Sequence, residues 1–236
     1  MKILGIIPAR AGSKGLKDKN ILKLNKKPLI AWSILAAKKS KVLSKVIVST
    51  DSLKISRIAK KYGAEVPFMR PAKYSGDKAK SSELIIHALN FFIKKKIHFD
   101  YVVLIEPTSP LREAGDIRKC ISLIKKNEID TLVSVSKVKS PHPRFIYKFS
   151  SEFKIKPYIS SKKNLSARRQ DVESLYFLEG TIYCSNVKTF LRKKTFYHNN
   201  TSAFVVPKWK SIEIDSLFDL KLSEFIMKNR KKYNNE

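Results

Sequence analysis

The sequence predicts an α/β protein with an open, mostly parallel sheet and helices on both of its faces. Apolar runs rich in β-branched residues alternate with amphipathic helical patterns in the first half of the chain, and repeated strand–helix units build such sheets. The 236 residues, 43% of them hydrophobic, suffice for one large domain. Only seven glycines, with no G-X-Y period and no repeat at solenoid spacing, exclude fibrous and solenoid architectures.

Strand and helix patterns alternate in the first half of the chain, except that two expected helices follow one another before the third strand. The expected strands lie at residues 3–8, 45–49, 100–105 and 130–136. The expected helices lie at residues 29–39, 53–62, 82–93 and 114–126. Because parallel strands need a crossover connection, usually a helix, this order indicates a Rossmann-like sheet.

The alternation breaks between residues 137 and 177 and then returns. This stretch is rich in Ser, Pro and Lys, which predicts an inserted arm on a single domain spanning residues 1–236. After it we expect strands at 180–184 and 203–206, a short helix at 187–192 and a closing helix at 216–227. The last residues, 229–236, are expected to form a frayed, solvated end.

The start of the chain and its two cysteines bear on the cellular compartment. Pro8 and Arg10 end the first apolar run after about five residues, too few for a signal-peptide core or a membrane span. We therefore expect a cytoplasmic protein without membrane attachment. Cys120 and Cys184 lie far apart with no C-x-x-C pattern, so neither a zinc site nor a disulfide framework is expected.

The net charge of +29 comes from 49 Lys and Arg against 20 Asp and Glu. Most of the basic residues are Lys spread over almost every segment, whereas proteins that read phosphates or base edges rely on the paired hydrogen bonds of Arg. Nucleic-acid binding is therefore not expected as the main function. The positive field favours an anionic small-molecule substrate, a polyphosphate or a carboxylate.

A loop with glycines and cations follows the first expected strand, where open parallel sheets bind nucleotides. Gly12 and Gly15 let backbone N–H groups approach phosphates, and Arg10, Lys14 and Lys19 supply positive charge. The loop matches neither GxxxxGK[ST] nor GxGxxG, which argues against a P-loop nucleotidase and a dinucleotide oxidoreductase. A basic surface loop without a ligand is the alternative.

Five segments occur in the order that one known family shows. They are PARAGSKGLKDKN, VSTDS, RPA, EPTSPLR and SIEIDSLFDL. With this ordered set, over residues 1–226, the chain resembles the acylneuraminate cytidylyltransferases, which make CMP-activated sialic acids and related nine-carbon acids. The resemblance implies a nucleotide-diphospho-sugar transferase type of fold, a dimerisation arm at 137–177, CTP at the first loop, and a requirement for Mg²⁺.

The resemblance also implies a set of site residues and a reaction. The nucleotide-binding residues would be Arg10, Ala11, Gly12, Ser13, Lys14, Lys19, Asn20, Arg70 and Ser81. The sugar-binding residues would be Glu106, Thr108, Ser109, Arg169 and Glu179. The metal-binding residues would be Glu213 and Asp215, and the catalytic residues Arg10, Lys14 and Asp215. The anomeric hydroxyl of the acid would attack the α-phosphate of CTP and release pyrophosphate, in a homodimeric enzyme that partners neither nucleic acid nor membrane.

Two of the implied sugar-binding segments can also be interpreted from their chemistry. Arg169 suits a 2-keto acid sugar, because a planar guanidinium holds a carboxylate at two points; an exposed basic turn is the alternative. In EPTSPLR the prolines fix the backbone, and Thr108, Ser109 and Arg112 offer hydroxyls and a cation. A turn without a ligand would have the same composition.

Three positions depart from the usual residues of the resembled family. Glu106 stands where Gln is frequent, Glu179 where Asn precedes Gly, and Glu213 where Asp begins an Asp-x-Asp pair. A carboxylate only accepts hydrogen bonds, whereas an amide also donates them. Plain N-acetylneuraminate is therefore not expected to be the preferred acid. Legionaminic, pseudaminic and octulosonic acids are alternatives; a glycosyltransferase of similar fold and a polyanion-binding protein are rivals.

The segment 212–215 is expected to end a strand just before the last helix. Alternation would then place Glu213 and Asp215 on the same side, where two carboxylates suit Mg²⁺ completed by phosphates. The alternative for Asp215 is an N-cap of the last helix.

Three further predictions concern single residues or small sets. Asp51 is expected to cap the helix that follows it, and His142 to pack within its loop. The aromatic residues expected in the core are Phe91, Phe92, Phe99 and Tyr101.

Overall fold

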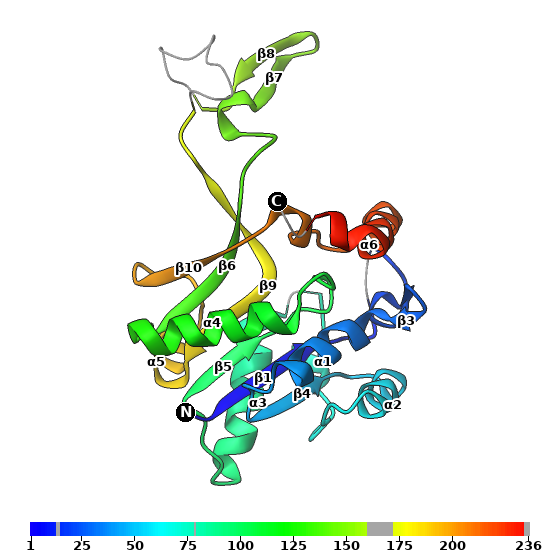
Figure 1. Cartoon of the computed structure of the whole chain (residues 1–236), viewed down its shortest axis with the longest axis vertical. Coiled ribbons are helices and arrows are strands. Elements are labelled where there is room, and N and C mark those ends of the chain that lie inside the picture. The colour runs from blue at the N-terminus through cyan, green and yellow to red at the C-terminus, as the bar shows by residue number, and fades with distance from the viewer. Residues whose placement is uncertain (13–14, 78, 160–171, 234–236) are drawn as a thin grey trace.

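A six-stranded sheet in the order β10-β6-β9-β5-β1-β4 forms the centre of the molecule (Figure 1). Its strands are β1 (Ile3–Pro8), β4 (Lys45–Ser49), β5 (Tyr101–Leu104), β6 (Thr131–Lys137), β9 (Tyr176–Asn186) and β10 (Thr201–Val206). The pairs β1–β4, β1–β5 and β10–β6 are parallel, and β9 runs antiparallel to both of its neighbours. This computed structural model describes residues 1–12, 15–77, 79–159 and 172–233, and it confirms the predicted mostly parallel α/β fold.

Helices cover both faces of the sheet. They are α1 (Leu29–Ser40), α2 (Leu53–Lys61), α3 (Ser81–Lys94), α4 (Ala114–Asn127), α5 (Val187–Lys193) and α6 (Leu217–Asn229). Short 3₁₀ turns add η1 (Lys19–Ile21), η2 (Ala72–Tyr74), η3 (Pro143–Phe145), η5 (Lys208–Lys210) and η6 (Arg230–Lys232). Each expected helix is present, with its ends within two residues of the predicted ones.

Strand β1 divides the hydrophobic core into two layers. Ile3 and Ile7 point into one layer, which contains residues of α1 and α4, while Leu4 and Ile6 point into the other, which contains residues of α3 and α5. Because successive side chains of a strand alternate between its faces, a run that is apolar at every position is buried on both sides.

The aromatic residues lie in or against the core as predicted, and the two free cysteines are also buried there. Cys120 and Cys184 are both buried in the α1/α4 layer. Phe92 is buried in the α3/α5 layer, with Phe91 and Phe99 packed against it, and Tyr101 packs against the other layer.

The arm leaves the body between two neighbouring antiparallel strands. Lys137 at the end of β6 pairs with Tyr176 at the start of β9, so both ends of the arm meet at its base. A two-stranded sheet, β7 (Tyr147–Ser151) with β8 (Lys154–Pro157), lies at the outer end, at the top of Figure 1. His142 packs as predicted: it is buried, and its ring accepts the N–H of Arg144.

One local prediction was wrong and one alternative is excluded, because a neighbouring serine makes the helix cap in each case. Ser52 caps α2 by accepting the N–H of Ile55, while Asp51 instead accepts the N–H of Ala11 at 2.9 Å. Ser216 caps α6 by accepting the N–H of Asp219, so Asp215 is not the cap.

Two further differences concern strands. Residues 212–215 lie in no strand. A small hairpin of β2 (Lys23–Leu24) and β3 (Lys27–Pro28) was not predicted.

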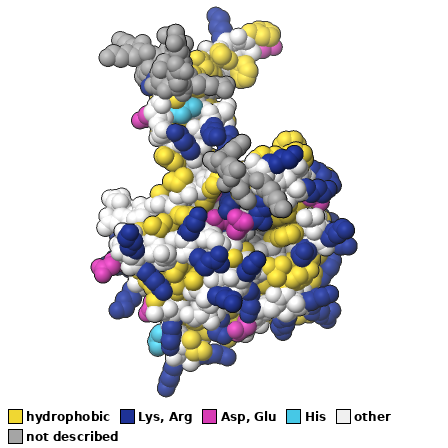
Figure 2. All heavy atoms as spheres, viewed as in Figure 1, with side chains coloured by type: hydrophobic (Ala, Val, Ile, Leu, Met, Phe, Trp, Pro, Cys, Tyr) yellow, Lys and Arg dark blue, Asp and Glu magenta, His cyan; other side chains and the backbone are white. Residues whose placement is uncertain are grey.

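Charge is distributed widely over the surface. Figure 2 shows Lys and Arg side chains scattered across the viewed face rather than gathered into one stripe, with Asp and Glu between them. Within the described residues, no helix has the length and apolar character needed to cross a bilayer.

Candidate active site

A cavity of about 460 Å³ opens beyond the carboxyl end of β1. Residues from four separate stretches of the chain line it, namely the first loop, the segment 70–84, the loop after β5 and the segment before α6. The predicted site residues in its wall are Arg10, Lys19, Asn20, Arg70, Ser81, Glu106, Thr108, Glu213 and Asp215. The structure therefore brings together residues that lie up to two hundred positions apart in the chain.

Cations of the first loop form ion pairs across the cavity. The ammonium Nζ of Lys19 lies 2.8 Å from Oδ1 of Asp215, and Nη1 of Arg10 lies 2.7 Å from Oδ1 of Asp77. The Asp215 side chain is 76% exposed, so solvent and a ligand can reach it. Because the cations hold carboxylates of the cavity wall, positive and negative groups face each other at its mouth.

The first loop is fastened at several points. The side-chain amide of Asn20 donates to the Arg10 carbonyl at 3.0 Å, and the Ala11 N–H donates to Asp51. A Cβ on Gly15 would lie only 2.7 Å from the Asp215 carbonyl oxygen, so this glycine lets the loop touch the segment before α6.

Some of the predicted residues do not line the cavity or lie outside the described residues. Ala11 and Gly12 are exposed and lie outside its lining. Ser13 and Lys14 lie outside the described residues, as does Arg169.

Arg70 lies in the wall of the cavity but binds the protein itself. Its guanidinium donates to the hydroxyl and the carbonyl of Ser49 at the end of β4. Burial lowers the pKa of Arg70 to about 10, which leaves the side chain charged at neutral pH.

Arg112 has a structural role rather than the substrate-facing one that its motif suggested. The buried guanidinium donates to the carbonyls of Glu106, Gly180 and Thr181. It also donates to Oγ of Ser33 on α1 at 2.9 Å. The same side chain thus joins the loop after β5, strand β9 and helix α1.

Ser109 and Glu179 are buried beside this junction and lie outside the cavity lining. The Glu179 carboxylate accepts both the N–H and the hydroxyl of Thr181, at 3.1 and 2.6 Å. Burial raises its pKa. In this structure, Glu179 serves the local fold of β9 and does not face the cavity.

The Glu106 carboxylate lies near the carboxylate of Glu213. A Cβ on Gly180 would lie 2.9 Å from Oε1 of Glu213 and 3.0 Å from Oε2 of Glu106, and it would also meet the Ser109 hydroxyl. Burial and the neighbouring charge of Glu213 raise the pKa of Glu106 to about 7. Glycine at position 180 is therefore what allows both carboxylates to approach β9.

Glu213 and Asp215 both line the cavity although their segment is not a strand. The N–H of Ile214 between them donates to the Thr108 carbonyl at 2.8 Å, which holds the segment against the loop after β5. Burial raises the pKa of Glu213, and a hydrogen bond with the backbone of Gly180 opposes that shift.

The carboxylates of the cavity fit a hard metal ion that also binds ligands from outside the protein. Within the described part of the chain, no group of three or more His, Cys, Asp or Glu side chains could hold a metal ion. Two carboxylates on one cavity suit Mg²⁺, which binds through one or two carboxylates together with substrate phosphates and water. They do not suit a closed zinc site.

A second cavity of about 380 Å³ adjoins the first and shares Glu106 and Ser81 with it. Its other lining residues are Lys80, Ser82, Leu104, Tyr183, Phe190, Lys194, Thr195, Phe196 and Tyr197. The aromatic members were not predictable from the sequence, because no motif marks them and only the chain path beyond α5 brings residues 195–197 to β9. The paired cavities give room for two ligands that meet near Glu106.

Comparisons with known proteins agree with this geometry. A family model described as Cytidylyltransferase matches residues 4–231. An N-acylneuraminate cytidylyltransferase of Escherichia coli is 36% identical over 233 residues, which cover 98% of this chain and 54% of that protein. A CMP-N,N'-diacetyllegionaminic acid synthase of Legionella pneumophila is 35% identical over 229 residues, covering 96% of this chain and 97% of that one. The chain thus spans about half the length of the first relative and nearly all of the second.

Solved structures support the fold. The structure of a CMP:2-keto-3-deoxy-manno-octonic acid synthetase in complex with CTP superposes with a TM-score of 0.72 at 14% identity, covering 98% of this chain and all of that one. At such low identity the likeness concerns the fold alone.

We predict that Arg112→Met destabilises the protein by about 3–5 kcal/mol, the scale seen when one partner of a buried ionic network is removed. Carbonyls of Glu106, Gly180 and Thr181 would lose a donor, and the buried Glu179 would lose its neighbouring cation. Urea unfolding measures the change. Arg118→Met is the control, since Arg118 is exposed on the same part of the chain and should alter stability by no more than about 0.5 kcal/mol. Equal stability of the two variants would contradict the prediction.

Proposed function

The chain belongs to the cytidylyltransferase family, and we propose that it activates a nonulosonic, sialic-type acid with CTP to give a CMP-sugar and pyrophosphate. The observation that carries the proposal is the cavity in which Arg10, Lys19 and Asp215 meet at the carboxyl edge of the sheet. Relatives named as cytidylyltransferases or synthases for sialic, legionaminic and pseudaminic acids, at 36%, 35% and 30% identity, support the same substrate class.

The first cavity has the charge that a nucleoside triphosphate requires. Arg10 and Lys19 supply cations, and Gly15 of the same loop also lies in the cavity wall. The carboxylates of Glu213 and Asp215 would hold Mg²⁺, which when bound supplies positive charge to the phosphate oxygens. Ser81 and Arg70 in the wall are placed to line the nucleoside. Lys14 and Ser13 remain predicted phosphate ligands.

The second cavity suits the acid. Tyr183, Phe196 and Tyr197 form an apolar wall that fits an acylamino group. The octulosonic acid carries no acyl group, so this wall favours a nine-carbon acylated acid. Glu106 and Thr108 lie toward the first cavity, and Arg169 remains the predicted partner of the acid's carboxylate.

Catalysis would consist of positioning and charge neutralisation. With CTP and the acid in adjoining cavities, the anomeric hydroxyl is held near the α-phosphate, and fixing two reactants in this way removes much of the entropic barrier. Lys19 and Arg10 would stabilise the negative charge that develops on the phosphate oxygens. The hydroxyl oxygen forms the new bond to phosphorus as the bond to pyrophosphate breaks, and no covalent enzyme intermediate is involved.

We also propose a homodimer formed through the arm. Phe149 is 76% exposed and Phe153 is 89% exposed, and both lie on the β7–β8 hairpin. Apolar side chains grouped on a projecting hairpin are typical of a protein interface. A second copy of this chain is the occupant that the resemblance implies.

The test of the proposed function is a panel of nucleotides and acids. We expect CTP to raise the melting temperature far more than ATP or GTP, since a ligand at about 100 times its Kd adds about 2.7 kcal/mol of stability. We then expect pyrophosphate release only when CTP is combined with an acylated nonulosonic acid. Equal melting shifts with all three nucleotides, or no release with any acid, would refute the proposal.

Asp215→Asn should fold normally and lose at least about a hundredfold in kcat, the scale found when electrostatic stabilisation of a transition state is removed. Glu213→Gln should lose less, because its carboxylate is more buried and binds the Gly180 backbone. Asp219→Asn is the matched control: Asp219 belongs to the capping box of α6, so its substitution should cost only about 0.5–2 kcal/mol of stability. Near wild-type turnover by Asp215→Asn at saturating Mg²⁺ would contradict the proposed role.

The dimer is tested with the double variant Phe149→Glu/Phe153→Glu. Removal of two exposed apolar side chains should weaken self-association about tenfold or more, as expected for central interface residues. Lys148→Glu on the same strand is the control, because it changes charge without removing apolar area. Sedimentation velocity measures both. A monomeric wild type at micromolar concentration would rule the dimer out.

A further inference from the structure

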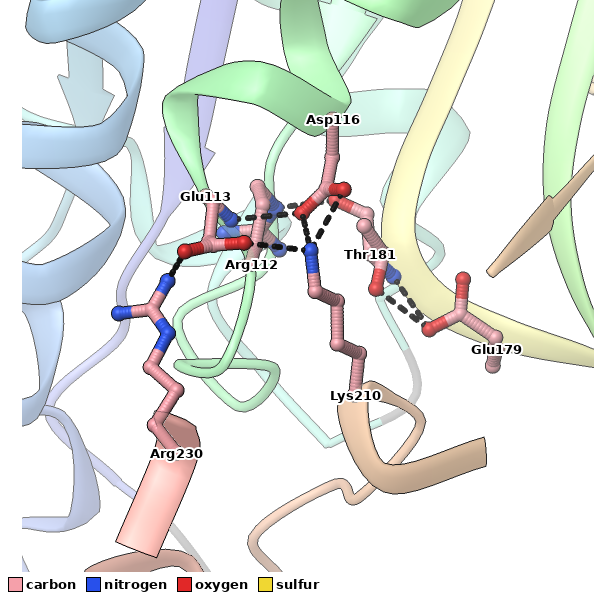
Figure 3. Close-up of polar contacts among 7 residues, drawn as sticks. All are labelled: Arg112, Glu113, Asp116, Glu179, Thr181, Lys210 and Arg230. Atoms are coloured by element: carbon pink, nitrogen blue, oxygen red, sulfur yellow. Dashed lines mark hydrogen bonds and ion pairs between the residues drawn. The ribbon is translucent and has the colours of Figure 1, made fainter. Parts of the chain in front are cut away.

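A buried ionic cluster lies at the start of α4, the helix that follows the loop after β5 (Figure 3). The Lys210 ammonium lies 2.7 Å from Oε2 of Glu113 and 2.8 Å from both carboxylate oxygens of Asp116. Arg230 reaches the other oxygen of Glu113 from the opposite side. The side chains of Lys210 and Asp116 are only 7% and 8% exposed.

These contacts use the whole hydrogen-bonding capacity of Lys210, since an ammonium has three donors and no acceptor. Asp116 is also committed, because one of its oxygens accepts the Glu113 N–H at 2.8 Å as part of the N-terminal cap of α4. The lysine is therefore fixed in position against the beginning of a fourteen-residue helix.

Burying such a cluster is poorly explained by stability alone. The desolvation of buried ions offsets much of their attraction, and well-packed apolar residues in their place often give equal or greater stability. A buried ion pair does, however, specify one arrangement of the segments that it joins. Here it joins η5 to α4.

Lys210 anchors the start of the segment 211–215, which carries the cavity carboxylates Glu213 and Asp215. Residues 211–215 belong to no helix or strand, so no regular ladder fixes them. Ile214 is held by its N–H bond to Thr108 and by burial among Leu24, Leu29 and Leu220. Glu213 thus lies between two anchors, Lys210 before it and Ile214 after it.

We propose that Lys210 is a positioning residue that sets the metal affinity of the Glu213/Asp215 pair by fixing their segment to Glu113 and Asp116. This inference rests on the proposed function, because it needs the pair to bind a divalent cation with CTP. Lys210 lines neither cavity. Its effect passes along the backbone through residues 211 and 212 to Glu213.

The test compares Lys210→Met with Arg230→Gln. Both variants remove a cation from Glu113, but only the first releases the carboxylate segment. One readout is the extra melting shift that Mg²⁺ adds to the shift caused by CTP alone; it requires no turnover. We expect Lys210→Met to keep the CTP shift and lose the Mg²⁺ increment, while Arg230→Gln keeps both.

Kinetics give the second readout. In Lys210→Met, the Mg²⁺ concentration for half-maximal rate should rise about 10–100-fold, the range for residues that support metal ligands, with a smaller change in the KM for CTP. Lys210→Arg, which keeps the charge, should recover part of this loss. A variant that is only less stable would not show a larger rise in the Mg²⁺ concentration for half-maximal rate than in the KM for CTP.

If Lys210→Met does not fold, the double variant Lys210→Met/Asp116→Asn replaces it, since no buried carboxylate is then left without a cation. It should fold and show the same loss of the Mg²⁺ increment.

Wild-type Mg²⁺ dependence in a folded Lys210 variant would overturn this inference and leave the proposed function intact. A wild type that is stabilised equally by CTP with and without Mg²⁺ would overturn the inference, and a wild type that forms no CMP-sugar would refute the function separately.

Discussion

The guanidinium of Arg112 is the contact on which the arrangement of the cavity depends. It is buried at the point where the loop after β5, strand β9 and helix α1 meet, and it satisfies a carbonyl or hydroxyl of each. Without it, these backbone oxygens would be buried without donors, which costs free energy for each one. Because Glu106 offers its carbonyl to Arg112, its carboxylate is held toward the cavity, where burial and Glu213 raise its pKa to about 7.

Charge balance explains how so many carboxylates stand together. Arg112 lies beside Glu179 and Glu106, Lys19 pairs with Asp215, and Lys210 neutralises Asp116. The buried acids Asp116 and Glu179 each have a nearby cation, as buried charges require. The pairs Arg112–Glu179, Lys19–Asp215 and Lys210–Asp116 join stretches that are distant in sequence, so the electrostatics also fix the tertiary arrangement.

The sequence predicted the elements of the fold because their signals are local. Apolar runs such as Ile3–Pro8 and the helical periodicity of Ala114–Asn127 need no partner to be recognised. The antiparallel direction of β9 was not predicted, since an apolar run carries no information on the direction of its neighbours. The cap of α2 was misassigned because Asp51 and Ser52 are both good capping residues, and the contact of Asp51 with the Ala11 N–H decided between them.

The cavity wall was predictable where a sequence motif marks it, as in the first loop, the loop after β5 and the segment before α6. Arg112 and Lys210 are polar residues whose partners come from elsewhere in the chain, so spacing gives no indication that they are buried. The two close contacts that glycines allow in the site were equally unpredictable from the sequence. Gly15 meets the Asp215 carbonyl, and Gly180 meets Glu213 and Glu106, and in each case the contact joins segments that no local pattern relates. Since a side chain at either position would collide with the opposing segment, the absence of a Cβ is as necessary to this cavity as the charges that line it.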